Sequence, residues 1–500
     1  MNFANFDRFP FLGTLNLDQD VTDRLSEHLV RTSKGSDSVY ITPLGKDKDI
    51  DKLLSEFDKV FNDGRSQINS VLLELEMSNR SKFGPRSIAI PWTSRKESLE
   101  SSFNTPKIEG IIGQYSTKGN LRPLSMTKGL SLLKNNTNSG LPFYTRKGKV
   151  KNRVSDKFDS LLKRRDPCIL FTRTQEQKKT RNVWGYPMAD TLNEMLFYSP
   201  LLAYQKKLPY RSALISPEAV SQAITRLILE RKGSEIIYSV DFSAYDTSVS
   251  PKLQNAAFNY IRSLFQPKFS PEIDYIEERF RSIGIVTPTG IMTGDHGVPS
   301  GSTFTNEVDS IVQVKISKTL PYITDESLQV QGDDGVYKLP KDKVDELSNT
   351  FESFGLTINR DKSYVSESYA VYLQNLFHID YVKDGKIGGI YPIYRALNRL
   401  IYQERWSDFE DFGISGKDYY SIRAISICEN CKYHPLFKEL VKFVVKHDKY
   451  SLDVSDQGIV NYVRMMNNTY GAGEILRHQY GDDIKGIRSF ETYKMIKELS

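Results

Sequence analysis

A short stretch with two adjacent aspartates, QGDDG at residues 331–335, most constrains how this chain can fold. Alternating apolar residues precede and follow it, which predicts a β-hairpin whose tight turn carries two carboxylates. Adjacent carboxylates repel each other, so a cation or a proton must neutralise them when a fold holds them together. The turn is either half of a metal site or an ordinary solvated Asp-Gly turn, and the pentapeptide alone does not decide.

The composition is that of a globular protein, either one large enzyme body or several domains. Of the 500 residues, 39% are hydrophobic and 11% are aromatic, which is ample for a core. No apolar run approaches the roughly 18 residues of a membrane span, and the first residues lack the apolar block of a signal peptide. We therefore expect a soluble protein that is not secreted.

The cysteine content favours a reducing compartment. Only three cysteines occur, so disulfides are not expected to hold the fold. Cys428, Cys431 and His434 have Cys-x2-Cys-x2-His spacing, but no fourth ligand follows at a zinc-finger distance. We interpret this cluster as a helical stretch with two semi-buried thiols.

Positive charge is concentrated between Arg146 and Arg181. This segment holds thirteen basic and four acidic residues, a net charge of +9, whereas the whole chain carries +6. Such a segment suggests a polyanionic partner, most commonly a nucleic acid, although a solvated charged loop would look the same. Within it, residues 171–183 are predicted to be extended, with Arg173, Lys179 and Arg181 on one face suited to a triphosphate.

A second carboxylate site is predicted where residues 236–240 form an apolar strand that ends on Asp241. Asp246, five residues later, could return to the same cleft. The Gly/Ser-rich loop at 297–306 leads into a helix and could bind anions or support a moving backbone. Residues 341–354 are predicted to be helical, and residues 355–362 to return as a strand.

Other patterns predict the scaffold around these segments. Apolar spacing favours helix over 51–76, with a possible break at 62–64, and a capped helix over 216–231. Residues 80–125 are expected to be irregular, and 137–143 to form a turn that lets a strand of nucleic acid pass close to main-chain groups. From about residue 370 we expect a short hairpin and then mostly helices.

The aspartates on the two strands converge on one chemistry. Asp241, Asp333 and Asp334 together can hold two divalent cations, which would activate a 3′-hydroxyl and brace a leaving pyrophosphate. A second Gly-Asp-Asp triplet, at 481–483, lacks strand alternation before it and is interpreted as a surface turn.

Six segments in order resemble the motifs of viral RNA-dependent RNA polymerases. They are SGLP at 139–142, RTQEQKKTR at 173–181, DFSAYD at 241–246, GVPSGSTFTNEVDS at 297–310, QGDDG at 331–335 and GLTINRDKS at 355–363. They look like motifs G, F, A, B, C and D of that family. The residues of these motifs are most similar to those of polymerases of small double-stranded RNA viruses, picobirnaviruses first and partitiviruses second.

The resemblance implies roles for individual residues. Asp241 and Asp333 would be the principal metal ligands, with Asp334 assisting, and the cofactor would be two Mg²⁺ ions, for which Mn²⁺ could substitute. Lys362 would be the general acid that protonates pyrophosphate. The remaining roles concern the nucleotide: Arg173, Lys179 and Arg181 would contact its triphosphate, Asp246 its ribose 2′-hydroxyl, and Ser300 and Gly301 would form the mobile loop beneath the nascent pair.

One position departs from the family pattern Ser-Gly-x3-Thr-x3-Asn. Ser300, Gly301 and Thr305 fit, but the last slot holds Asp309, while Asn306 directly follows Thr305. Because Thr305 and Asp309 are four residues apart, they share a helix face, from which Asn306 is turned by roughly 100°. We therefore favour Thr305 and Asp309 as partners of Asp246, with Asn306 second.

The resemblance also implies an α+β right-hand polymerase, with fingers, a palm on an antiparallel sheet and a helical thumb, closed by an N-terminal extension. We place an N-terminal arm at 1–60, fingers with some palm elements at 61–235, the palm with an inserted fingers segment at 236–390, and the thumb with the C-terminal segment at 391–500. The aromatic residues Tyr450, Tyr462, Tyr470 and Tyr480 could form an initiation platform, although helix packing explains them as well.

The implied function is template-directed RNA synthesis that replicates and transcribes a double-stranded RNA genome and can start without a primer. Its partners would be RNA template and product, ribonucleoside triphosphates and viral capsid protein, with no membrane, in the virion interior and host cytoplasm. Two alternatives remain at this point. A reverse transcriptase shares the palm carboxylates, although Asp246 argues for ribonucleotides, and a non-enzymatic RNA-binding virion protein would explain the basic segment alone.

Overall fold

The chain forms two compact units in a computed structural model that describes residues 9–108, 119–470 and 486–499. The first unit is built from segments within 1–35, 91–172 and 182–373, and the second from segments within 36–90, 173–181 and 374–500. The predicted boundaries near residues 60, 235 and 390 do not coincide with these units, and the division into fingers, palm and thumb stays a prediction. No helix of the described residues is long and apolar enough to cross a membrane.

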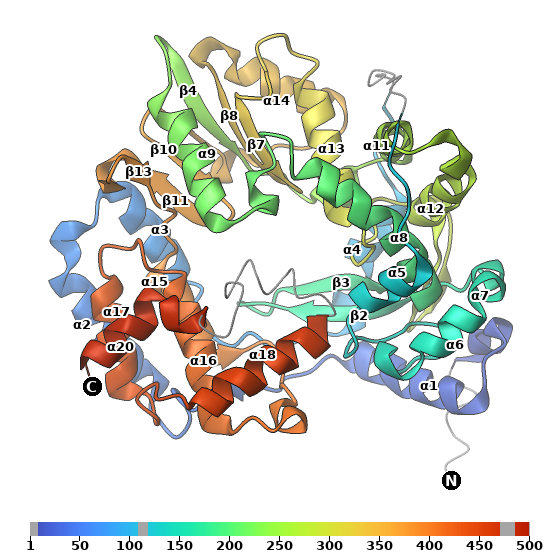
Figure 1. Cartoon of the computed structure of the whole chain (residues 1–500), viewed down its shortest axis with the longest axis horizontal. Coiled ribbons are helices and arrows are strands. Elements are labelled where there is room, and N and C mark those ends of the chain that lie inside the picture. The colour runs from blue at the N-terminus through green and yellow to red at the C-terminus, as the bar shows by residue number, and fades with distance from the viewer. Residues whose placement is uncertain (1–8, 109–118, 471–485, 500) are drawn as a thin grey trace. The chain divides into compact units, whose positions relative to one another are not determined.

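An antiparallel four-stranded sheet, in the order β7-β8-β4-β9, organises the first unit (Figure 1). Its central strand β4 (Glu235–Val240) is buried over five of its six positions, as expected for a β-branched and aromatic run covered on both faces. β4 pairs with β8 (Asp334–Pro340) and with β9 (Tyr364–Ser366), and β8 also pairs with β7 (Leu328–Gln331). This is the antiparallel sheet that the sequence predicted.

Helices cover the sheet and enclose the main core. α9 (Pro217–Leu229) packs against β4, β7 and β8, and α13 (Thr305–Ser317) packs against β7 and α14 (Val344–Ser353). α9 begins as the sequence predicted, because the Ser216 hydroxyl accepts a hydrogen bond from the Ala219 N–H and Pro217 occupies the first helical position. α13 is buried around most of its circumference, so it is a core element and not a surface helix.

A second four-stranded sheet has the order β3-β2-β5-β6 and belongs to the first unit except for residues 173–181. Its strands are β2 (Cys168–Thr174), β3 (Thr180–Gly185), β5 (Ile285–Thr287) and β6 (Gly290–Met292). The other elements of this unit are α1 (Gln19–Lys34), α4 (Lys96–Glu100), α5 (Met126–Leu132), α6 (Lys151–Asp156), α7 (Phe158–Arg164), α8 (Met188–Gln205), α10 (Tyr245–Ser248), α11 (Pro251–Leu264), α12 (Ser270–Ser282) and β10 (Tyr369–Tyr372).

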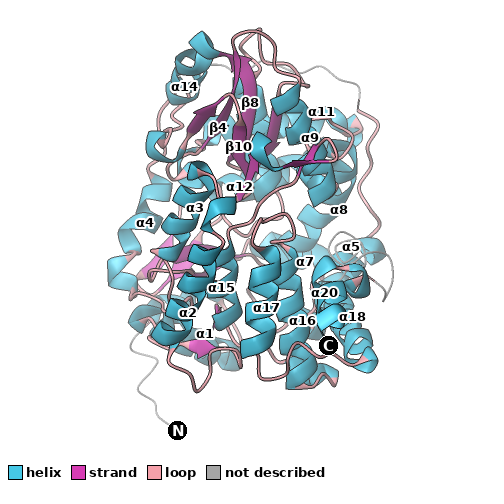
Figure 2. Cartoon of the chain, turned by 90° about the vertical axis from the view of Figure 1, so that its left-hand side faces the viewer, coloured by secondary structure: helices cyan, strands magenta, loops and turns pink. Residues whose placement is uncertain are grey.

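The second unit is mainly helical (Figure 2). Phe57 and Phe61 of one helix pack on Tyr394 of another, with ring centroids 5.4 and 5.1 Å apart. Its elements are β1 (Tyr40–Ile41), α2 (Ile50–Asp63), α3 (Ser70–Arg80), β11 (Asn375–His378), β12 (Val382–Lys383), β13 (Lys386–Ile387), α15 (Ile393–Ile401), β14 (Tyr402–Gln403), α16 (Gly416–Glu429), α17 (Phe437–His447), α18 (Asp456–Tyr470) and α20 (Glu491–Leu499). The predicted break at 62–64 is confirmed between α2 and α3.

Two local predictions are wrong. Residues 355–362 do not form a strand: they end in the 3₁₀ turn η10 (Arg360–Lys362), and strand β9 begins only at Tyr364. Ile358 forms an isolated antiparallel bridge with Phe242, and beyond it the Lys362 N–H bonds back to the Asn359 carbonyl at 3.1 Å, which turns the chain. Residues 171–183 are likewise not one extended chain, because they fold back between β2 and β3.

Candidate active site

Asp241 and Asp334 lie at the same end of two neighbouring strands. In the antiparallel pair β4–β8 the last matched residues are Val240 and Gly335. Asp241 follows Val240 and Asp334 precedes Gly335, so the register sets the two aspartates next to each other. Both are half-buried. The prediction that residues 236–240 form a strand ending at Asp241 is confirmed.

The hairpin turn consists of Gly332 and Asp333. Gln331 pairs with Asp334, so only these two residues join β7 to β8. Gly332 has φ of 65°, the left-handed value that glycine adopts without strain, and positive φ at the first central position fits a type II′ turn. Asp333 takes the second central position and is exposed at the tip. The predicted hairpin is therefore confirmed.

The main chain of Asp241 is fixed by the segment that follows α14. Its N–H donates to the Ser363 hydroxyl at 3.0 Å, and its carbonyl accepts from the Asn359 N–H at 2.8 Å. Lys362, the proposed proton donor, is exposed in the same segment. The loop that carries Lys362 is thus tied directly to the strand end that carries Asp241.

No group of three or more His, Cys, Asp or Glu side chains is arranged to hold a metal ion among the residues that the structure describes. The donor chemistry nevertheless suits a hard divalent cation, because Asp241, Asp333 and Asp334 offer only carboxylate oxygens. Their assignment as metal ligands stays a prediction.

Asp246 and Asp309 form a second carboxyl pair near Asp333. Burial raises the pKa of Asp309 well above its usual value, and the charges of Asp246 and Asp333 and a hydrogen bond with Asp246 raise it further. A raised pKa favours the protonated form of Asp309, and a protonated carboxyl can donate a hydrogen bond to the Asp246 carboxylate.

Thr305 and Asn306 point to other partners. The Thr305 hydroxyl donates to the Pro299 carbonyl at 3.0 Å, inside the preceding loop. The Asn306 amide donates to Glu307 at 3.3 Å. Asp309 is hydrogen-bonded to Asp246, whereas Thr305, which was favoured equally as a partner of Asp246, bonds to Pro299 instead. Which residue reads the ribose together with Asp246 stays a prediction.

The Gly/Ser-rich loop rests on the edge of β3. The Ser300 hydroxyl donates to the Asn182 carbonyl at 3.0 Å, and the Ser300 carbonyl accepts from the Trp184 N–H at 2.9 Å. Gly301 has φ of 131°, and a Cβ there would lie 2.3 Å from the Trp184 carbonyl oxygen. A side chain at position 301 is therefore excluded by both backbone conformation and space.

Glu194 in α8 anchors this loop from beneath and was missed by the sequence analysis. One of its carboxylate oxygens accepts from the Ser302 hydroxyl and the other from the Thr303 N–H, both at 2.7 Å. Burial raises the pKa of Glu194 to about 7, partly offset by these two hydrogen bonds. No local pattern marks Glu194, because its partners lie more than 100 residues later in the chain.

Glu194 should make the stability of the protein depend on pH. Its pKa rises from 4.5 to about 7 on folding, so the folded state holds a proton that the unfolded state releases between these values. The free energy of unfolding should therefore fall across this window as pH rises, on the order of 3 kcal/mol relative to Glu194→Gln. Thermal unfolding of both proteins from pH 4.5 to 7.5 measures this, and parallel curves would contradict it.

Arg211 and Glu307 form a fully buried ion pair behind the hairpin. Their side chains are 1% and 0% exposed, and the two guanidinium nitrogens donate to the carboxylate at 2.6 and 3.0 Å. Arg211 also donates to Gln331, the residue that precedes the Gly-Asp-Asp turn, at 3.3 Å. No local sequence pattern indicates this pair, which joins residues 96 positions apart.

The basic residues predicted at the triphosphate do not lie on a single extended strand. Arg173 is in β2, Arg181 is in β3, and the chain reverses between them at Gln177 and Lys178, each with φ of 57°. Arg173 pairs with Glu404 at 3.5 Å. Arg173, Lys179 and Arg181 belong to the second compact unit, whereas the aspartates belong to the first, so contact with the triphosphate stays a prediction.

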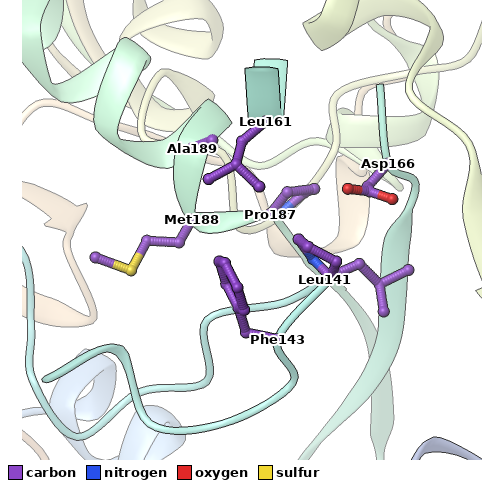
Figure 3. A pocket seen from close by; sticks show the side chains of 8 residues that line it. Leu141, Phe143, Leu161, Asp166, Pro187, Met188 and Ala189 are labelled. Atoms are coloured by element: carbon purple, nitrogen blue, oxygen red, sulfur yellow. The ribbon is translucent and has the colours of Figure 1, made fainter. Parts of the chain in front are cut away.

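The corner predicted at 137–143 is built on Gly140, where φ is 61° and a Cβ would lie 2.4 Å from the Tyr186 carbonyl oxygen. A small pocket adjoins it (Figure 3). The lining residues are Leu141, Pro142, Phe143, Leu161, Asp166, Pro187, Met188 and Ala189. The lining is apolar except for Asp166, which pairs with Arg164 at 3.0 Å, so the pocket offers no group for catalysis.

The Cys428, Cys431 and His434 cluster is structural. Both thiols are buried, and Cys428 lies in α16, so the helical interpretation is confirmed although the thiols are more deeply buried than predicted. The His434 ring bonds to Glu76 at 2.9 Å, and Glu76 also accepts the N–H groups at the start of α15. The second Gly-Asp-Asp triplet, at 481–483, and Tyr480 lie outside the described residues, as does the Tyr470 side chain.

An antiparallel sheet with aspartates at the end of a central strand and at the turn of the neighbouring hairpin is the arrangement expected of a right-hand polymerase. Two crystal structures of the RNA-dependent RNA polymerase of a human picobirnavirus, one of them an insertion-loop deletion mutant, have this fold. Each matches at 24% sequence identity, with all of both chains covered and TM-scores of 0.80 and, for the deletion mutant, 0.81. The predicted right-hand polymerase fold is confirmed.

The particular family follows from the sequence. The sequence model of the viral RNA-dependent RNA polymerases matches residues 95–378, and the chain belongs to this family. It is 28% identical to a potential RNA-dependent RNA polymerase of human picobirnavirus over 86% of each protein. It is 27% identical to an RNA-directed RNA polymerase of Cryptosporidium parvum virus 1 over 44% of each. The predicted enzyme class and the resemblance to picobirnavirus polymerases are confirmed.

Proposed function

We propose that this polymerase replicates and transcribes a double-stranded RNA genome by nucleotidyl transfer that uses two divalent metal ions, and that it can start synthesis without a primer. The observation that carries the proposal is the placement of Asp241 and the Asp333–Asp334 turn at one end of the same antiparallel sheet. The chain belongs to a family of RNA polymerases, which identifies RNA as both template and product.

Asp241 and Asp333 would hold the metal ions, with Asp334 assisting, and Mg²⁺ is the cation that best suits three carboxylates. The bound ions would lower the pKa of the attacking 3′-hydroxyl and neutralise charge on the leaving pyrophosphate. The protein itself fixes the approach of the two strands, through the register of β4 with β8 and through the Ser363 and Asn359 contacts to Asp241.

The nucleotide would be recognised by its sugar and its phosphates. Asp246, held by its hydrogen bond with the protonated Asp309, would accept the ribose 2′-hydroxyl. Ser300 and Gly301 would support the nascent pair, Lys179 and Arg181 would contact the triphosphate with Arg173 nearby, and the exposed Lys362 would protonate the pyrophosphate. A reverse transcriptase would not need an acceptor for the 2′-hydroxyl, because its deoxyribonucleotide substrates have none.

The proposal is tested by supplying purified protein with an RNA template, with and without primer, and with either Mg²⁺ or Mn²⁺. We expect product from ribonucleotides with both metals and in the absence of primer. If no product forms in the absence of primer, the proposal of primer-free initiation is wrong. A preference for deoxynucleotides would overturn the assignment as an RNA polymerase.

Asp246→Ala should reduce the preference for ribonucleotides over deoxynucleotides by about tenfold or more, because a lost hydrogen bond to the sugar costs on the order of 1–2 kcal/mol. Asp309→Asn is the matched variant, since an amide donates to Asp246 as the protonated carboxyl does, and its preference should stay within about threefold of wild type. Competition assays with paired nucleotides measure both. An unchanged preference in Asp246→Ala would contradict sugar recognition by this residue.

We further propose that the polymerase works in the virion interior and the host cytoplasm, with capsid protein as a partner. The family membership supports a viral setting, and the basic segment supports contact with RNA phosphates. Co-purification of the polymerase with RNA-filled particles would test the location.

A further inference from the structure

The buried helix α13 holds the peptide groups of the catalytic turn. The Gly332 N–H donates to the Ser310 hydroxyl at 2.7 Å, and the Gly332 carbonyl accepts from the Gln313 side-chain amide at 3.0 Å. Ser310 and Gln313 are both 0% exposed. Ser310 and Gln313, which lie within one turn of α13, therefore both bond to Gly332.

Other contacts fix the two side chains in this role. The Ser310 hydroxyl donates to the Asn306 carbonyl at 2.6 Å, which leaves its oxygen to accept from Gly332. The Gln313 oxygen accepts from the Tyr337 hydroxyl at 2.8 Å, which orients the amide nitrogen toward the turn. Both side chains thus have their hydrogen bonds satisfied only when the turn is in place.

The hairpin itself is shaped to receive Gln313. A Cβ on Gly335 would lie 1.9 Å from the Gln313 oxygen, so only glycine allows this approach. Glycine is therefore needed on both sides of the aspartate pair: Gly332 for its left-handed backbone, and Gly335 for contact with α13.

We propose that Ser310 and Gln313 are positioning residues that set the place of Asp333 relative to α13. The carbonyl of Gly332 belongs to the peptide group that includes the Asp333 nitrogen, so its hydrogen bond to Gln313 orients the start of Asp333. α13 also carries Asp309, the partner of Asp246. The pair Ser310 and Gln313, called the clamp from here on, therefore joins the catalytic turn to the residues that would face the sugar. The inference rests on the proposed function in taking Asp333 as a catalytic metal ligand.

Three variants of the full chain test the clamp. Ser310→Ala removes the acceptor for Gly332, Gln313→Met removes the donor at nearly constant volume, and Ser348→Ala is the matched control. Ser348 is equally buried and bonds to Tyr238 at 2.8 Å, but it does not contact the turn. Hydrogen exchange over residues 328–336 is followed without metal or nucleotide, and kcat and KM are measured well below the melting temperature of each variant.

We expect the Gly332 amide to exchange about tenfold faster or more in Ser310→Ala, with no change there in Ser348→Ala. In both clamp variants kcat should fall about tenfold, because the turn is misplaced, while KM for the nucleotide changes less than threefold. If both clamp variants exchange and react like Ser348→Ala, the clamp is overturned. If one clamp variant does not fold, the other decides by the same two measurements.

The outcome is separable from that of the proposed function. Asp333→Asn tests the catalytic carboxylate directly, so an active Asp333→Asn enzyme would refute the proposed function whatever the clamp variants do. An inactive Asp333→Asn enzyme together with clamp variants that match Ser348→Ala would refute the clamp alone.

Discussion

Asp333→Asn should lower RNA synthesis by at least about 10³-fold while RNA binding stays within about twofold of wild type. The substitution keeps the shape of the side chain but removes the negative charge that a divalent cation requires, and catalysis by bound metal is worth several kcal/mol. Asp333 is exposed at the turn, so its replacement should change the free energy of unfolding by no more than about 0.5 kcal/mol. Primer extension, RNA affinity and thermal unfolding of the purified variant measure the three quantities.

The second Gly-Asp-Asp triplet supplies a control for this experiment. Asp482→Asn makes the same chemical change in the same tripeptide, at 481–483. It should keep full activity, because the context of strand and hairpin gives the first triplet its role and not the triplet itself. Undiminished synthesis by Asp333→Asn would end the metal hypothesis.

Arg211→Met should destabilise the protein by about 3–5 kcal/mol, the largest stability effect that we expect from a single substitution. The variant leaves the Glu307 carboxylate, which is 0% exposed, without its principal partner. Removing one member of a buried ion pair costs this much because the remaining charge cannot be solvated. Denaturant unfolding, monitored by circular dichroism, measures the loss.

Two comparison proteins separate this cause from a general effect of losing a cation. Lys96→Met breaks an exposed pair with Glu100, whose side chains are 44% and 43% exposed, and should cost no more than about 1 kcal/mol. The double variant Arg211→Met/Glu307→Leu, which removes both charges, should regain a large part of the stability. If Arg211→Met is as stable as Lys96→Met, the ion pair is not important for stability.

Local chemistry made several parts of the fold predictable. The alternating residues around QGDDG, the apolar strand before Asp241 and the Ser-Pro start of α9 each specify structure through neighbours a few residues away. For the same reason the sequence identified the aspartate that follows β4 and those at the hairpin turn. It failed at 355–362 and at 171–183, where short-range turns compete with an extended pattern of similar appearance.

Contacts between distant segments were not predictable. Glu194 bonds to Ser302 across 108 positions, and Arg211 bonds to Glu307 across 96 positions. Neither glutamate stands out in the sequence, because a charged residue in a helix is usually on the surface. Only the packing of α8 and α13 into the core shows that these residues are buried and paired.

The sequence by itself determined which residue types lie at the strand end and at the turn, because hydrogen bonding and side-chain alternation act over a few residues. Only the tertiary structure decided that Asp309 is buried beside Asp246, and that Ser310 and Gln313 hold Gly332. Those contacts depend on how α13 is rotated and buried against β7. Such a rotation is fixed by the packing of the whole core and not by any local stretch of the chain.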